Sequence, residues 1–73
     1  SIDFKPPTIE DLERRKREIL EEVITKTIPE LTSKDKELGR KLAKDTLEDI
    51  RFGNNPDLEG KFWEIIKQCG IDL

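Results

Sequence analysis

Apolar residues recur at helical spacing in three stretches of the chain, separated by residues that start or stop helices. At this spacing apolar side chains return every three or four positions and share one face of a helix. The stretches cover residues 8–26, 33–52 and 56–69, and residues 1–7 precede them as an extended arm. The pattern predicts one all-α domain over residues 1–73, a small three-helix bundle with a short extended N-terminal arm.

The central stretch, residues 33–52, has the widest apolar face, and small residues occupy the middle of that face. They are Gly39, Ala43 and Thr46. Glycine inside a helix costs ~1 kcal/mol relative to alanine. We therefore expect Gly39 to mark a close approach of two helix backbones, with this helix lying between the other two.

Capping residues predict where the first helix begins and ends. Thr8 is a favourable N-cap, and Asp11 three positions later completes a capping box. Pro29 disfavours helical geometry at the residue before it. The first helix is therefore expected to end near Lys26, with a short turn or a single helical turn over residues 28–31.

The other two helices also have terminal signals. Thr32 or Ser33 is expected to cap the central helix. Gly53 suits a left-handed residue after that helix, and Asn55 with Pro56 suits the start of the last one. The last helix should end in a Schellman motif, with Gly70 in the left-handed position and Ile71 packed back onto Ile66.

The apolar stripe of the first helix is interrupted by one charged residue. The stripe consists of Ile9, Leu12, Ile19, Leu20 and Val23, with Ile24 on its flank. Lys16 falls in its middle. Either the aliphatic part of Lys16 covers apolar surface while its amine reaches water, or the bundle is open at this point. We favour the first interpretation.

Trp63 projects away from the apolar stripe of the last helix. One interpretation is that Phe4 or Phe52 covers its ring at the edge of the bundle. The other is that Trp63 is an exposed anchor for a binding partner. The arm likewise either folds back and lays Phe4 on the bundle, or serves as a linker or docking segment.

Charged residues make up 42% of the chain, and 17 acidic residues outnumber 14 basic ones. The net charge of −3 does not favour general attraction to nucleic acid or to an anionic membrane. Most basic residues also stand at helical spacing from acids, which is typical of solvated ion pairs. A nucleic-acid contact, if one exists, would use the basic residues of the first two helices: Arg14, Arg15, Arg17, Arg40, Lys41 and Lys44.

The residue inventory does not favour catalysis. The chain has no histidine, and its one cysteine, Cys69, lies on the apolar side of the last helix. No glycine-rich phosphate loop occurs, and the ligands of a zinc site are too few. We expect no enzymatic activity, no metal, no cofactor and no small-molecule substrate.

The absence of an apolar run of about 20 residues predicts no membrane span. A single cysteine cannot form an internal disulfide, so a reducing, cytoplasmic setting is expected. Whether the chain is a whole protein or a fragment of a longer one stays open.

A non-catalytic protein–protein interaction module, adaptor or regulatory in character, is the function that these observations favour. The partner is another protein or a second copy of the chain, as in a homodimer. A nucleic-acid-binding helical domain is the alternative. The candidate partner-binding residues are Trp63, Phe4, Lys16 and Ile24.

Overall fold

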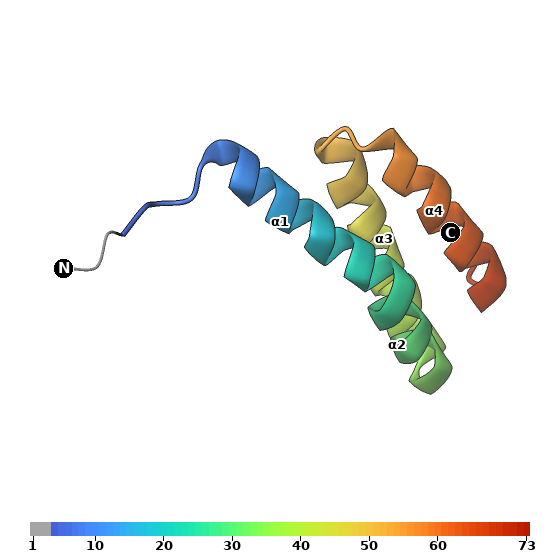
Figure 1. The fold of residues 1–73 in the computed structure, drawn as a ribbon. Coiled ribbons are helices and arrows are strands. Elements are labelled where there is room, and N and C mark those ends of the chain that lie inside the picture. The colour runs from blue at the N-terminus through green and yellow to red at the C-terminus, as the bar shows by residue number, and fades with distance from the viewer. Residues whose placement is uncertain (1–3) are drawn as a thin grey trace.

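The computed structural model describes residues 4–73, which form a bundle of helices without strands (Figure 1). The elements are α1 (Ile9–Glu22), a π-helical turn η1 (Val23–Thr27), α2 (Ile28–Lys34), α3 (Lys36–Phe52) and α4 (Pro56–Cys69). The backbone keeps right-handed helical angles where α1, η1 and α2 meet, so these three elements form one long helix. The predicted all-α fold with three helices is confirmed.

The first helix does not end before Pro29, as the sequence had led us to expect. Pro29 instead lies in the first turn of α2, and the helix continues to Lys34. Proline lacks an N–H and its ring crowds the carbonyl four residues earlier. The π turn relieves this crowding, since the N–H of Ile28 donates to the carbonyl of Val23, five residues back.

The central helix begins three residues later than expected, because neither Thr32 nor Ser33 caps it. Both hydroxyls donate to carbonyl groups of α2, at 2.6 and 2.7 Å. Asp35 is the N-cap, and its Oδ1 accepts from two backbone N–H groups of α3, each at 3.1 Å. This carboxylate also lies at the positive end of the α3 dipole.

Local signals correctly identified the other helix ends. The capping box between Thr8 and Asp11 is present, with both hydrogen bonds formed. Gly70 has a left-handed φ of 67°, and the N–H of Ile71 donates to the Ile66 carbonyl at 3.2 Å, as in a Schellman motif. In the α3–α4 loop, however, Asn54 takes the left-handed conformation (φ 55°) that we expected at Gly53.

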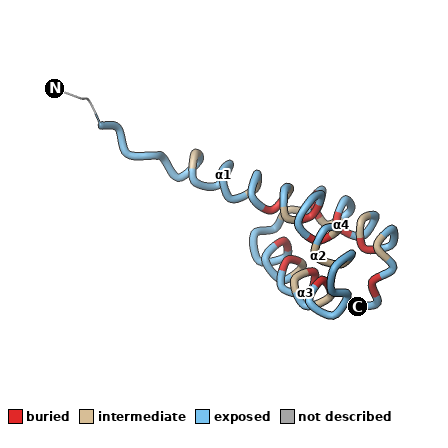
Figure 2. The backbone as a smooth tube through the Cα atoms, turned by 90° about the horizontal axis from the view of Figure 1, so that it is seen from below, coloured by how far each residue is buried: buried red, intermediate tan, exposed pale blue. Residues whose placement is uncertain are grey.

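The core lies where η1 and α2 pack against α3 and α4. The buried apolar residues are Leu20, Ile24, Ile28, Ala43, Ile50, Leu58, Phe62, Ile66 and Ile71. Leu20 is the only buried residue of α1, so most of that helix lies outside the core (Figure 2).

The molecule is elongated, with extents of 52 × 25 × 15 Å. Its Cα radius of gyration is 14.7 Å, against ~11 Å for a compact domain of this length. The difference arises because the first turns of α1 and residues 4–8 extend away from the bundle (Figure 1). Residues 1–3 of the predicted arm lie outside the described residues.

Candidate functional site

Four of the six basic residues predicted to contact nucleic acid line three different hollows of the surface, and Arg14 instead pairs with Asp11 at 3.0 Å. Arg15 lies beside the arm, Arg17 lies beside the α3–α4 loop, and Arg40 and Lys44 line a groove that contains Trp63. Lys41 is exposed but does not line that groove. The positions do not favour the single basic patch that a nucleic-acid interface would need.

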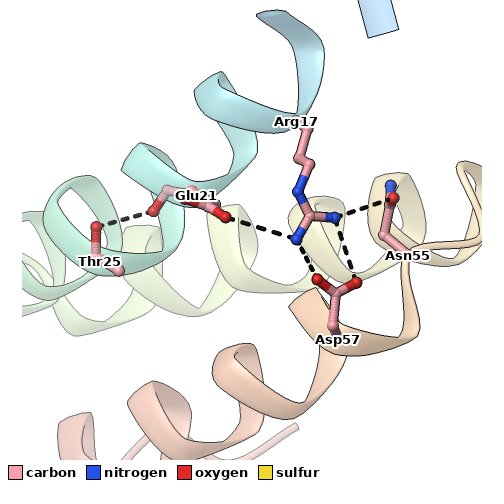
Figure 3. Close-up of polar contacts among 5 residues, drawn as sticks. All are labelled: Arg17, Glu21, Thr25, Asn55 and Asp57. Carbon is pink, nitrogen blue, oxygen red and sulfur yellow. Dashed lines mark hydrogen bonds and ion pairs between the residues drawn. The ribbon is translucent and has the colours of Figure 1, made fainter. Parts of the chain in front are cut away.

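Arg17 joins α1 to the beginning of α4 (Figure 3). Its guanidinium group donates two parallel hydrogen bonds to the carboxylate of Asp57, and a third, at 3.5 Å, to Oδ1 of Asn55. Glu21, one helical turn further along α1, lies 3.7 Å away. The sequence pattern suggested a partner within α1 for Arg17, so its long-range role was not foreseen.

The same contact changes the acidity of Asp57. The hydrogen bond from Arg17 holds the pKa of the Asp57 carboxyl below its ordinary value of 3.8. Asp57 also lies in the first turn of α4, where the helix dipole favours a negative charge. Arg17 is therefore committed to a structural ion pair and is a poor candidate for contact with a ligand.

A groove of about 320 Å³ between α3 and α4 brings Trp63 together with basic and apolar side chains. We call it the Trp63 groove; its lining is Arg40, Lys44, Leu47, Arg51, Trp63 and Leu73. Trp63 is 39% exposed, and its ring meets that of Phe62 edge to face, at 5.2 Å and 77°. Neither Phe4 nor Phe52 lines the groove, so the expectation that one of them covers Trp63 is wrong.

Two of the three cations of the Trp63 groove are held by acids beside it. Arg40 donates to Glu37 at 3.0 Å, and Arg51 donates to Glu59 at 2.7 Å. Arg40 in turn lowers the pKa of the Glu37 carboxyl. Lys44 forms no ion pair within the described part of the chain.

A second surface feature is a largely apolar stripe on α1 that the core leaves exposed. We call it the α1 seam; it consists of Ile9, Leu12, Lys16 and Ile19. Its three apolar members are 75%, 51% and 62% exposed, in that order. The single stripe predicted for this helix is thus divided, since Leu20 and Ile24 turn into the core while these residues remain outside.

Lys16 lies within the α1 seam, and its side chain also borders a hollow beside the end of α3. It is exposed and shares a hollow of about 160 Å³ with Leu20 and Phe52. A lysine that is exposed and borders apolar Leu20 and Phe52 fits both interpretations of Lys16, so neither of them is confirmed.

The structure removes Ile24 from the predicted partner-binding set. Its side chain is completely buried at the centre of the core and cannot reach a partner. Phe4 is exposed, but residues 4–8 lead away from the bundle, so the expectation that Phe4 packs on it is wrong. Trp63 and Lys16 keep accessible positions, in two different hollows.

Sequence reasoning missed three residues of the Trp63 groove: Leu47, Arg51 and Leu73. A signal for two of them was available. Arg40, Lys44, Leu47 and Arg51 are spaced by four, three and four positions, which puts them on one face of a helix. Leu73 follows α4, and only the folded chain brings it to this face.

The described residues contain no group of three or more acidic, histidine or cysteine side chains that could hold a metal ion. Cys69 is half-buried. No helix among residues 4–73 is long and apolar enough to cross a membrane.

The Trp63 groove and the α1 seam both offer a ligand apolar contact combined with positive charge.

Comparison of the chain with protein-family models, with curated proteins and with solved structures found no match.

Proposed function

We propose that the chain is a non-catalytic protein–protein interaction module whose α1 seam pairs with an amphipathic helix of a partner protein. The observation that carries this proposal is the exposure of Ile9, Leu12 and Ile19 on one face of a helix that extends beyond its own core.

Partner binding would supply the stabilisation that the first half of α1 lacks. An isolated helix of this length is marginal in water, because most helical stability in proteins comes from packing of an apolar face. The turns before Leu20 contribute no buried residue. Full burial of one leucine or isoleucine side chain is worth about 1.5–3 kcal/mol, so covering three of them is a substantial driving force.

The spacing of the α1 seam suits a partner helix. Its members follow one another by three, four and three positions, which is the repeat of the apolar seam in paired helices. Such a seam packs side chains of one helix into the spaces between side chains of the other.

The charges beside the α1 seam favour a different protein over a second copy of the chain. In a parallel self-paired dimer, Lys16 would face its own copy inside the seam. In an antiparallel dimer, Arg15 would lie beside its own copy on one flank, and Glu13 beside its copy on the other. Like charges across an interface disfavour the pairing. A partner helix with an acidic residue opposite Lys16 avoids both conflicts.

A charge-swap experiment tests this proposal. The probe is a synthetic amphipathic peptide of about three heptads with a glutamate opposite Lys16, compared with the same peptide carrying lysine there. We expect the glutamate peptide to bind the wild-type chain at least about tenfold more tightly in calorimetry. The variant Lys16→Glu should reverse that preference.

Two matched substitutions locate the binding surface. Leu12→Ser should abolish peptide binding, whereas Glu18→Ser, on the opposite side of the same helix, should leave it unchanged. Equal affinity for the two peptides would contradict the proposal. So would a wild-type mass near twice 8.5 kDa in sedimentation equilibrium that Leu12→Ser returns to 8.5 kDa, since a second copy would then occupy the seam.

A further inference from the structure

The Trp63 groove is a second surface, and it shares no lining residue with the α1 seam. Four of its residues form one face of α3, namely Arg40, Lys44, Leu47 and Arg51. Trp63 contributes an aromatic side chain from α4, and Leu73 lies beyond the end of that helix. The groove therefore combines three cations with three apolar groups.

The positive charge of the groove is a local feature, because the chain as a whole carries a net charge of −3. Glu37 and Glu59 each hold one arginine of the groove in place through a charge-assisted hydrogen bond. A guanidinium group has five N–H donors, so both arginines keep donors for a ligand. The Lys44 amine, which has no ion pair with a described residue, is the cation most available to a ligand carboxylate.

The apolar part of the groove is firmly supported. Leu47 is half-buried and packs against the core, and the Trp63 ring is held at a steep angle to the buried Phe62 ring. Leu73 is about half exposed at the groove surface. Aromatic residues with arginine neighbours often dominate the energetics of protein interfaces. The groove can thus bury an apolar side chain of a ligand while its cations face the flanking groups.

We infer that the Trp63 groove binds an acidic peptide segment of a partner protein, with an apolar side chain set between carboxylates. Charge complementarity selects this occupant. A nucleic-acid strand would place a continuous row of phosphates against Glu37 and Glu59 as well as against the cations. It would also require the basic residues of α1, which line other hollows.

Trp63 is the only tryptophan of the chain, so its fluorescence reports directly on the groove. The probe is a short peptide with one leucine between two pairs of glutamates, and the comparison peptide carries lysine at the four glutamate positions. We expect the acidic peptide to shift the Trp63 emission in a saturable manner. The basic peptide should produce no shift.

Charge reversal on α3 provides a matched pair of variants. Lys44→Glu should weaken binding of the acidic peptide at least about tenfold, since it replaces the attracting amine by a repelling carboxylate. Lys41→Glu makes the same change in net charge on the same helix but outside the groove, and it should alter affinity less than about threefold. Circular dichroism of both variants confirms that the helices remain.

Three results would overturn the inference. The first is no fluorescence change with saturating acidic peptide. The second is equal weakening by Lys44→Glu and Lys41→Glu, which would show that only net charge matters. The third is tighter binding of a single-stranded oligothymidylate than of the acidic peptide, which would assign the groove to nucleic acid. Leu12→Ser should leave this binding intact, so the two proposed surfaces can fail independently.

Discussion

Gly39 of α3 lies directly against the backbone of Thr32 in α2. A β-carbon at position 39 would be 2.8 Å from the Thr32 Cα, closer than side chains approach a backbone atom. Gly39 is also buried. The absence of a side chain lets α2 and α3 cross with their backbones in near contact, so the cost of glycine inside a helix is offset by the packing that it allows.

The substitution Gly39→Ala should therefore destabilise the bundle. Overpacking of a filled site costs about 1–3 kcal/mol, and the gain in helix propensity returns only about 1 kcal/mol. We expect a lower free energy of unfolding in urea, measured by circular dichroism. An unchanged or raised value would show that α2 can move away from α3 without loss.

The substitution Gly60→Ala should have the opposite effect. Gly60 lies inside α4, and a β-carbon there would meet no described heavy atom within 4 Å apart from its chain neighbours and the backbone of its own helix. Alanine restricts the unfolded chain and favours the helix, so the free energy of unfolding should rise by about 0.4–1 kcal/mol. Because both variants make the same chemical change, their difference isolates the close contact at Gly39.

The close helix contact at Gly39 could be predicted from the sequence because glycine inside a helix costs stability, and close packing of two backbones compensates for that cost. Helix ends fixed by residues close in sequence, such as Thr8 with Asp11 and Gly70 with Ile71, could be predicted because their hydrogen bonds are local. The continuation of the first helix past Pro29 could not be predicted from the sequence. It depends on a π turn, and packing against α3 and α4 holds that turn in place.

The candidate surfaces were only partly predictable. Lys44 and Trp63 were identified for unrelated reasons, one as a basic residue and one as an aromatic residue outside a stripe. Their meeting in one groove depends on how α3 and α4 pack. The sequence also did not predict that the apolar stripe of the first helix would be divided between the core and the solvent. Sequence periodicity shows which side chains share a helix face, but it does not show where along the helix the core ends.

Phe62 and Trp63 are adjacent in sequence but should respond very differently to replacement by alanine. Phe62 is completely buried, so Phe62→Ala should cost about 3–5 kcal/mol and unfold much of a domain this small. Trp63 is partly exposed, and its loss should leave the helical circular dichroism spectrum intact. It should also remove binding of the acidic peptide, measured by calorimetry because the variant has no tryptophan fluorescence. Unfolding by Trp63→Ala would show that this residue belongs to the core, and would contradict its role as an anchor.

The Arg17–Asp57 ion pair should make the stability depend on acid pH. Arg17 lowers the pKa of the Asp57 carboxyl in the folded chain, so at neutral pH the pair contributes its full stabilisation. As the pH falls past the ordinary value of 3.8, the unfolded chain takes up the proton first. The contribution then declines, and it is lost below the folded pKa.

Asp57→Asn should therefore lower the melting temperature at pH 7 and make its decline on acidification shallower. The control is Asp72→Asn, at an exposed aspartate outside every ion pair of the described residues. Thermal unfolding of the three proteins between pH 2 and pH 7 gives the comparison. Identical acid profiles for the wild type and Asp57→Asn would mean that the Arg17 contact contributes nothing in solution.

Replacing Lys16 by leucine should convert the α1 seam into a self-associating surface. If two wild-type chains paired their α1 seams in parallel, the two Lys16 amines would meet at the buried interface and repel each other. We therefore expect the wild-type chain to be a monomer. Lys16→Leu removes this repulsion and joins Leu12 to Ile19 in an unbroken apolar stripe. The measured mass in sedimentation equilibrium should then rise with concentration towards twice 8.5 kDa.

The matched control is Glu18→Leu, which adds the same apolar side chain to a different face of α1. It should leave the chain monomeric, because a single leucine there has no apolar neighbours with which to form a seam. Equal association of both variants would mean that added hydrophobicity alone causes the effect. A monomeric Lys16→Leu variant would show that the seam cannot pair with itself even without the charge, so the repulsion at Lys16 could no longer be the reason for favouring a different partner.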